Sequence, residues 1–559
     1  MQSKRILAVM TSAWAAKKKQ KKNNSNVFFI NTLLAFAVSV WSVSGYSALT
    51  DNLGVSTKAM SLGNAVTAAP PGIMSIHFNP AGLTQLPGTN FEWHLLAPKF
   101  QFDIDFIAPP GWEGVFGFTD DPVVGQSSSS GQMSLLIPYV GMVDFPEVFA
   151  LPLGGFSVQS RKNPKLFFAN AIYAPAALGY TRDDDADPAR FGGRKLALER
   201  ITYLSPSLAY KYSDELSFGV SVGFNYTAFA ANTDFRVPNE LIGLIRVIQD
   251  DICPELGGLG GLLPDCLGEG LGPFDNIANL DIWGDDGVTL SYNLGVLWEP
   301  KPWVSMGAVY QSGYTANLRG EFEITNSFGF QSTFNALGAS VLGPIIQAIG
   351  LPVSVGEKEE GDVKVDLVMP QRVQMGLKFT PTKNYFHIPT KKMQFTVDWS
   401  WADWGEWDAI NINFDRATNV TRLAAFLGLA ELDSLALPRG YRSVGNWGFG
   451  FQFDMTKKTQ LRMGWEPRIG SVPDDKIDTI APLAYADFYS LGFGYKWAPD
   501  REMDFTVSYL VSEIYAPAES SCNLNCSGIN NIVYNPYATL DVNIKTQALI
   551  LGATFKYNF

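Results

Sequence analysis

The sequence predicts an all-β membrane protein, built as a fourteen-stranded antiparallel transmembrane β-barrel. Hydrophobic residues make up 46% of the 559 residues and aromatic residues 13%, whereas charged residues reach only 17%. After residue 43, no apolar run in the sequence is long enough for a membrane helix. Long stretches instead alternate apolar with small polar residues, the pattern by which membrane barrels keep their overall hydropathy near neutral.

The N-terminus has the features of a secretory signal. Seven basic and no acidic residues precede the apolar run Val27 to Val43, and small residues follow at 44–48. We expect residues 1–47 to be a signal peptide cleaved near Ser47; a membrane anchor is the alternative, although 17 residues is short for one. Their removal changes the net charge from −12 to −19, which disfavours nucleic acid as a partner.

Period-two alternation identifies the strands. From Leu216 to Thr227, large apolar residues alternate with Gly, Ser, Asn and Thr, and the segment ending at Phe559 repeats the pattern. A soluble sandwich would carry many charges on the second face, so the small polar face is assigned to a lumen and the aromatic face to lipid. A terminal Phe also resembles the end signal of bacterial outer-membrane barrels. Strands are expected to start near residues 90, 131, 165, 196, 215, 286, 303, 363, 391, 442, 458, 484, 502 and 541.

Short connections alternate with long ones, as expected for tight periplasmic turns and longer extracellular loops. The long loops are expected at about residues 232–285, 320–362 and 416–441. They contain apolar segments of helical spacing, which are Pro238–Asp251, Phe334–Gly350 and Leu423–Leu437. These segments could pack on one another as a lid or form a docking surface for hydrophobic molecules, and the two roles are compatible.

The four cysteines form two close pairs in loop-like sequence. In an exported chain, disulfides Cys253–Cys266 and Cys522–Cys526 are the leading interpretation. Metal binding is less favoured, because the three histidines, His77, His94 and His387, lie far from both pairs in the sequence. We therefore expect neither a metal site nor a cofactor.

Several short motifs occur in order along nearly the whole mature chain. The first is Asn79-Pro80-Ala81-Gly82-Leu83, preceded by the small-residue stretch 59–65. Others are residues 173–182, 204–210, 369–377, 397–404, 461–465 and the terminal 555–559. Their order and spacing resemble the FadL/OMPP1/TodX family of outer-membrane transporters. The segment before Ala59 departs from the family pattern, and the paired cysteines are not a general feature of the family.

The resemblance implies a lumen plugged by an N-terminal hatch at about residues 48–89, followed by the barrel at 90–559. Family members reside in the outer membrane of Gram-negative bacteria and take up hydrophobic compounds passively. They capture the ligand at the outer loops, hold it near the hatch and release it sideways into lipid at a kink in the third strand. Long-chain fatty acids are the expected ligands here, and aromatic hydrocarbons are the alternative.

A hatch has a physical purpose, because a fourteen-stranded lumen is too wide for wall side chains to fill. Asn79 is expected to cap a short helical turn with Pro80 at its first position. The expected pocket and hatch residues are Ile76, Phe78, Asn79, Pro80, Ala81, Gly82 and Leu83. The alternative is that the Asn-Pro-Ala-Gly stretch is only a tight turn that ends the plug.

Pro175 is the expected site of the lateral opening, together with Gly179 in the same strand. Proline removes a ladder donor, and a closed barrel has no edge on which to place it, so Pro175 should separate neighbouring strands. The alternative is that Pro175 merely starts an outer loop.

A ligand carboxylate would require an inward-facing cation, for which Arg200, Arg319 and Arg372 are candidates. Their alternative role is pairing with acidic residues in the lumen. No histidine accompanies a recognisable Ser or Asp motif, so an outer-membrane lipase or protease is disfavoured. A general porin is also disfavoured, because it should have a charged constriction and no apolar hatch.

Overall fold

The computed structural model describes residues 53–137, 140–145, 151–247, 270–340, 343–384, 389–428, 430–480, 485–527 and 535–559. The predicted signal peptide, residues 1–47, lies outside the described residues. Among the helices that are described, none combines the length and the hydropathy needed to cross a bilayer.

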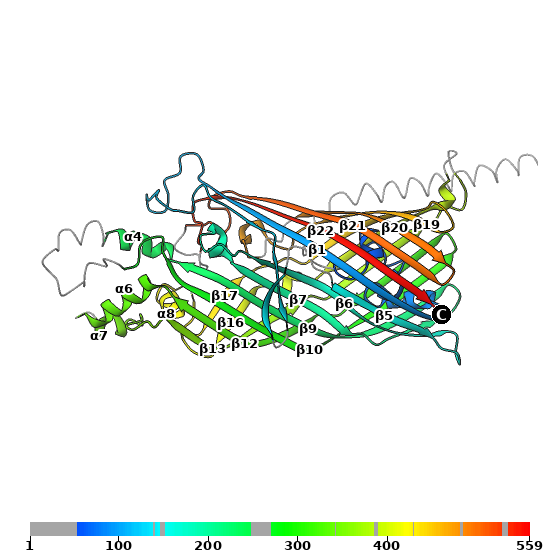
Figure 1. Ribbon diagram of the computed structural model, residues 1–559, viewed down its shortest axis with the longest axis horizontal. Helices are drawn as coiled ribbons and strands as arrows, with labels where there is room; N and C mark the ends of the chain where they lie inside the picture. Colours follow the sequence, from blue (N-terminus) through cyan, green and yellow to red (C-terminus); the bar gives the residue numbers. More distant parts are fainter. Residues whose placement is uncertain are drawn as a thin grey trace, which may run out of the picture. The chain divides into compact units, whose positions relative to one another are not determined.

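One antiparallel sheet closes on itself. Strand β1 (Thr89–Ile107) pairs with β22 (Asp541–Asn558) along its whole length, from Asn90↔Asn558 to Ile107↔Asp541. The two strands run side by side in Figure 1, so the first wall strand meets the last. The pairings around the sheet confirm the predicted closed barrel of fourteen antiparallel strands.

Several wall strands consist of two segments that share one position in the barrel. The remaining segments in order around the barrel are β2 (Ser127–Ser130) with β5 (Leu151–Gln159), β6 (Leu166–Thr181), β7 (Lys195–Leu204) with β8 (Ser207–Lys211), β9 (Leu216–Arg236), β10 (Asn276–Lys301), β11 (Val304–Gln311) with β12 (Tyr314–Asn326), β13 (Lys358–Met369) with β14 (Arg372–Phe379), β15 (Met393–Ala402) with β16 (Ala409–Phe414), β17 (Ser434–Pro438) with β18 (Val444–Asp454), β19 (Thr459–Arg468), β20 (Ala486–Ala498) and β21 (Arg501–Ala516).

The two faces of the wall differ as the alternation predicts. In β1, Phe91 and Trp93 are exposed on the outer face, while Asn90 and Glu92 are buried on the lumen face. Large exposed side chains recur on strand after strand, which would be costly in water and is favourable against lipid hydrocarbon.

The strands extend further than the sequence indicates. Strand β9 continues to Arg236, and β10 already begins at Asn276, so the expected loop 232–285 is too wide. The expected loop 320–362 is too wide for the same reason, because β12 ends at Asn326 and β13 starts at Lys358. These extensions pair polar residues, such as Asn279↔Asp234, and therefore lack the apolar alternation of a lipid-facing strand.

Helices α4 (Asn239–Val247), α6 (Phe328–Ala339), α7 (Gly343–Ala348) and α8 (Asn419–Phe426) lie at the end of the barrel opposite the C-terminal residue (Figure 1). The helical segment expected at Phe334–Gly350 is two helices. The segment expected at Leu423–Leu437 is helical only to Phe426, because its last residues form β17 and pair with β16.

The second wall strand is interrupted, contrary to the single strand expected near residue 131. Between β2 and β5 the chain forms a hairpin of β3 (Met133–Ile137) and β4 (Gly141–Phe145). Leu136 packs on Ala197 and Ala228 of the outer face, and its N–H donates to the carboxylate of Glu199. The apolar run of β3 has the composition of a wall strand, but it covers the outside of β7 and β9 instead.

The hatch fills the lumen with four short helices. They are α2 (Thr57–Met60), η2 (Gly72–Met74), α3 (Ser75–Phe78) and η3 (Pro80–Gln85). The Thr67 N–H donates to Asp398 of β15 at 2.7 Å, and the Asn64 side chain donates to Glu466 of β19 at 2.8 Å. Asn293 of β10 donates to the Ile76 carbonyl at 3.1 Å. The hatch is therefore hydrogen-bonded to wall strands on several sides.

Glycines on the lumen face allow the hatch to touch the wall backbone. A Cβ added at Gly307 would lie 2.1 Å from the Thr67 carbonyl oxygen, and one added at Gly464 would lie 2.0 Å from the Gly63 nitrogen. The same close approach is found at Gly219, Gly295, Gly448, Gly450 and Gly492. The small residues that alternate along the strands therefore form the seat of the plug.

Candidate functional site

An apolar cavity of about 200 Å³ lies in the lumen, towards the end that carries the helices. We call it the upper cavity. Its wall combines the far ends of β9, β10, β16 and β17 with α8, and includes Phe229, Ile282, Ile412 and Leu423. A cavity of this size and lining suits a small hydrophobic molecule.

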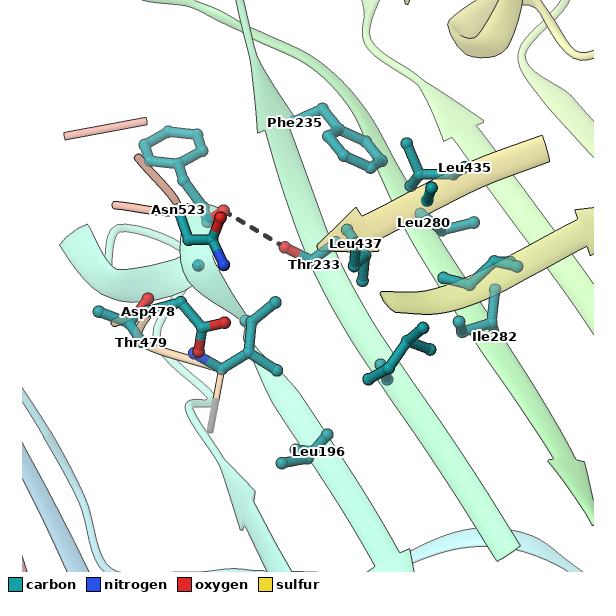
Figure 2. A pocket seen from close by; sticks show the side chains of 18 of the residues that line it. Leu196, Thr233, Phe235, Leu280, Ile282, Leu435, Leu437, Asp478, Thr479 and Asn523 are labelled. Carbon is teal, nitrogen blue, oxygen red and sulfur yellow. Dashed lines mark hydrogen bonds between the residues drawn. The ribbon is translucent and has the colours of Figure 1, made fainter. Parts of the chain in front are cut away.

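The upper cavity has one polar end. Asp478, Thr479 and Asn523 lie on one side of it, across from the apolar wall that includes Leu280 and Leu437 (Figure 2). Arg439 also lines this end and forms a buried ion pair with Asp478.

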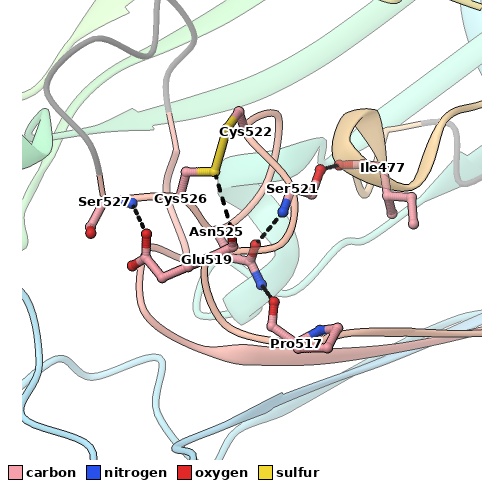
Figure 3. Close-up of a disulfide and its surroundings, with 8 residues drawn as sticks. All are labelled: Ile477, Pro517, Glu519, Ser521, Cys522, Asn525, Cys526 and Ser527. Atoms are coloured by element: carbon pink, nitrogen blue, oxygen red, sulfur yellow. Dashed lines mark hydrogen bonds between the residues drawn. A yellow bond between two sulfur atoms is a disulfide. The ribbon is translucent and has the colours of Figure 1, made fainter.

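The loop carrying Asn523 is closed by a disulfide between Cys522 and Cys526, whose Cα atoms are 4.8 Å apart (Figure 3). Ser521 anchors the loop by donating to the Ile477 carbonyl at 2.6 Å. The second expected pair, Cys253 and Cys266, lies outside the described residues.

A smaller cavity of about 50 Å³ lies next to the upper one, and we call it the lower cavity. His77 of the hatch, Pro175 and Arg200 are among its lining residues. The two cavities share Leu198, Trp404 and Trp407, so these three side chains form the junction between them. The rings of Trp404 and Trp407 meet edge to face at 5.3 Å, and Trp407 stacks on Tyr441 at 5.5 Å.

The barrel wall is incomplete beside the lower cavity. In the β6–β7 ladder Tyr173 pairs with Thr202 and Ala176 with Arg200, so β6 carries one extra residue and a bulge around Pro175. Strand β6 pairs with β5 only up to Ile172, and β1 pairs with neither β5 nor β2 between residues 97 and 101. We call this interruption the ladder gap.

Pro175 thus lies inside a strand and not at the start of a loop. The hatch approaches the same place from inside, since a Cβ at Gly54 would lie 2.5 Å from the Ala174 carbonyl oxygen. Gly179, also expected at the opening, lies against the β3–β4 hairpin. Its missing side chain makes room for β3, because a Cβ there would lie 1.9 Å from the Ser134 carbonyl oxygen.

The hatch residues expected to line a ligand pocket lie elsewhere. Ile76, Phe78 and Leu83 are fully buried and pack with Phe167 and Tyr173 of β6 in the core between hatch and wall. These three line neither of the two cavities, nor do Asn79, Pro80, Ala81 and Gly82, so the two cavities give no support to the expected pocket role.

The Asn-Pro-Ala-Gly stretch instead holds the hatch together. The Asn79 side chain accepts from the Ala81 N–H at 3.2 Å and caps η3, with Pro80 in its first turn. Its amide nitrogen donates to the Thr67 carbonyl at 2.8 Å, while Ala81 is fully buried and a Cβ at Gly82 would lie 2.2 Å from Pro70. The apolar residues of this segment form the interior of the plug.

The three arginine candidates lie in different places. Arg200 and Arg372 both line the lower cavity, and the Arg200 guanidinium lies 5.1 Å from the centre of the Tyr314 ring. Arg319 is exposed and follows the buried Leu318, so it faces away from the lumen. The expected inward orientation of Arg319 is therefore wrong, because the register of β12 directs the even-numbered residues inward.

His77 is buried in the hatch. Burial, followed by the nearby Arg200 and Arg372 guanidinium groups, holds the pKa of His77 well below its usual range. The imidazole is therefore neutral at pH 7. His94 hydrogen-bonds Thr554 at 2.8 Å, and His387 lies outside the described residues.

The lining residues of the upper cavity were missed by sequence reasoning. They come from strand ends, loops and a helix that are far apart in the chain. One sequence signal for this cavity is the alternating apolar set Ile410, Ile412 and Phe414, which continues after the aromatic stretch of its strand has ended.

Comparisons with known proteins agree with this architecture. A family model described as "Outer membrane protein transport protein (OMPP1/FadL/TodX)" matches residues 36–559. A Pseudomonas aeruginosa FadL homologue of known structure matches with a TM-score of 0.62 and 15% identity, over 92% of this chain and 100% of that one. The P. putida toluene transporter TodX gives 0.56 and 15%, over 91% and 99%. The Ralstonia pickettii toluene transporter TbuX gives 0.53 and 16%, again over 91% and 99%. No curated protein matches the chain.

Proposed function

The chain belongs to the OMPP1/FadL/TodX family of outer-membrane transport proteins, and we propose that it passes hydrophobic compounds sideways into the membrane. Membership places the barrel in the outer membrane of a Gram-negative bacterium. The observation that carries the proposal is a row of two adjoining cavities that ends at the ladder gap beside Pro175.

The ligand enters the upper cavity first, because that cavity is apolar, larger than the lower one and lined by the loop helix α8. It then passes the junction of Leu198, Trp404 and Trp407 into the lower cavity. Each buried methylene contributes about 0.8 kcal/mol, so a hydrophobic molecule gains in both cavities and again in lipid. The route runs downhill and needs no energy source.

The exit is the ladder gap. Hatch and wall glycines close the axial route, whereas strand pairing is missing between β5 and β6 above Ile172. The β3–β4 hairpin starts beside β6 and presents Val140, which is 69% exposed, with Met142 and Val143 half-buried. This apolar surface leads from the gap along the outside of the wall.

Two ligand classes fit this route, and one observation favours each of them. Arg200 pairs with Ala176 at the bulge and Arg372 lines the same cavity, which favours the carboxylate of a long-chain fatty acid. Aromatic side chains at the junction favour aromatic hydrocarbons. Solved relatives include both a FadL homologue and toluene transporters.

Substituting Leu198→Trp tests the route, because it fills the junction between the two cavities. We expect uptake of radiolabelled oleate and of toluene to fall about tenfold in a Gram-negative host that has no other such transporter. The matched control is Leu208→Trp, at a position 38% exposed on the outer face, and it should transport normally. Wild-type uptake by the Leu198→Trp variant would show that the ligand bypasses the junction.

A further inference from the structure

The polar end of the upper cavity contains two buried polar atoms that lack a hydrogen-bond partner within the described part of the chain. They are Oδ1 of Asn523 and Nε of Arg439. The two residues are 8% and 3% exposed, and both line the cavity. A buried polar atom left unpaired costs about 1–3 kcal/mol, so this pair points to a ligand.

The orientation of the Asn523 amide is set by its neighbours. Its nitrogen donates to the Pro438 carbonyl at 2.7 Å and to the Lys476 carbonyl at 3.2 Å, which leaves Oδ1 as a free acceptor. Pro438 directly precedes Arg439, so the acceptor and the donor lie in the same corner. The Cys522–Cys526 disulfide closes the loop that presents Asn523 (Figure 3).

The charges at this cavity are compensated. Each basic side chain that lines it has an acidic partner: Lys195 with Asp144 at 2.6 Å, Arg236 with Asp121 at 3.1 Å, and Arg439 with Asp478. A ligand carboxylate would lose its hydration here without gaining an uncommitted cation, and it would lie near Asp478. The corner therefore suits a neutral polar group.

We propose that the upper cavity binds a neutral hydrocarbon that carries one hydroxyl group, such as an alkylphenol or an alcohol. The hydroxyl donates to Asn523 Oδ1 and accepts from the Arg439 Nε–H, and the hydrocarbon body packs on the wall that includes Leu280 and Ile282. This inference rests on the proposed function, since the bound molecule is the one in transit. A hydrocarbon would leave both atoms unpaired, and a carboxylate has no proton for Asn523.

The test compares three probes that differ in one group: 4-ethylphenol, ethylbenzene and 4-ethylbenzoate. Their dissociation constants for the full chain in lipid nanodiscs are measured by calorimetry at neutral pH. Because a site built for a hydroxyl discriminates against analogues without one, 4-ethylphenol should bind at least about tenfold more tightly than either other probe.

Two variants assign the preference to the polar corner. Asn523→Leu should reduce the advantage of 4-ethylphenol over ethylbenzene to within about twofold. Ile282→Val, in the apolar wall, should weaken 4-ethylphenol and ethylbenzene by a similar factor and keep their ratio.

The outcomes separate the inference from the proposed function. Equal binding of 4-ethylphenol and ethylbenzene overturns the inference while transport of hydrophobic compounds stands. Tightest binding of 4-ethylbenzoate also overturns it, and assigns an acidic ligand to the cavity. Failure of all three probes to bind, together with absent uptake in cells, overturns the inference and the proposed function alike.

Discussion

Deleting residues 48–88 is expected to turn the barrel into an open and unselective pore. The described part of this segment, from residue 53, fills the lumen and hydrogen-bonds to Asp398, Glu466 and Asn293 of three wall strands. A fourteen-stranded barrel without it encloses a channel wide enough for water and small solutes. Single-channel conductance in planar bilayers, and sensitivity of the host to a bulky antibiotic, should both rise steeply. Unchanged conductance would contradict the plug.

A single substitution should reproduce part of this effect. Gly464→Val adds atoms where the Gly63 backbone nitrogen now lies, and overpacking of this kind costs about 1–3 kcal/mol. We expect intermittent channel openings as the hatch loses its seat. The matched control is Gly287→Val in β10, where a Cβ would meet nothing within 4 Å, and this variant should stay closed. A Gly464→Val variant without channel openings would mean that the hatch adapts to the wall.

Removing Pro175 is expected to abolish most hydrophobic uptake while the barrel still folds. The deletion takes out the extra residue between Tyr173 and Ala176 and allows the β6–β7 ladder to run without a bulge. With the proline absent, β6 also regains a backbone donor on that stretch. Uptake of a radiolabelled hydrophobic substrate should fall about tenfold, while the heat-dependent gel mobility of the folded barrel should persist.

Two substitutions accompany that experiment, one as an intermediate case and one as a control. Pro175→Val restores the backbone N–H but keeps the extra residue, so an intermediate uptake is expected. Pro467→Val changes a strand proline that pairs with Asp487, away from the ladder gap, and should leave uptake unchanged. Full uptake by the deletion variant would remove the basis for a lateral exit.

The wall of the barrel could be predicted because its environment repeats with the period of the strand. Lipid on one side and a crowded lumen on the other impose the alternation from Leu216 to Thr227 and place the last strand at residue 541. The alternation ends where the strands leave the membrane, which is why the sequence predicts loops at the far ends of β9 and β10.

The cavity and the hairpin could not be predicted in this way. Residues such as Asn523, Asp478 and Ile282 meet only through tertiary structure, and none of them belongs to a local motif. The β3 segment has the residues of a wall strand, and only its packing on Ala197 shows that it lies outside the wall. Arg319 shows the same limit, since its strand was recognised but its side was not.

The central claim is that the ligand leaves through the side of the barrel while the hatch stays seated. It is tested most directly by linking the hatch to the wall and measuring transport. The side chains of Asn64 and Glu466 are 2.8 Å apart, so Asn64→Cys with Glu466→Cys can be joined by a short bifunctional maleimide. Uptake of the hydrophobic substrate by the linked protein should remain within about twofold of the unlinked protein. A loss of uptake in proportion to the extent of linking would contradict the lateral route.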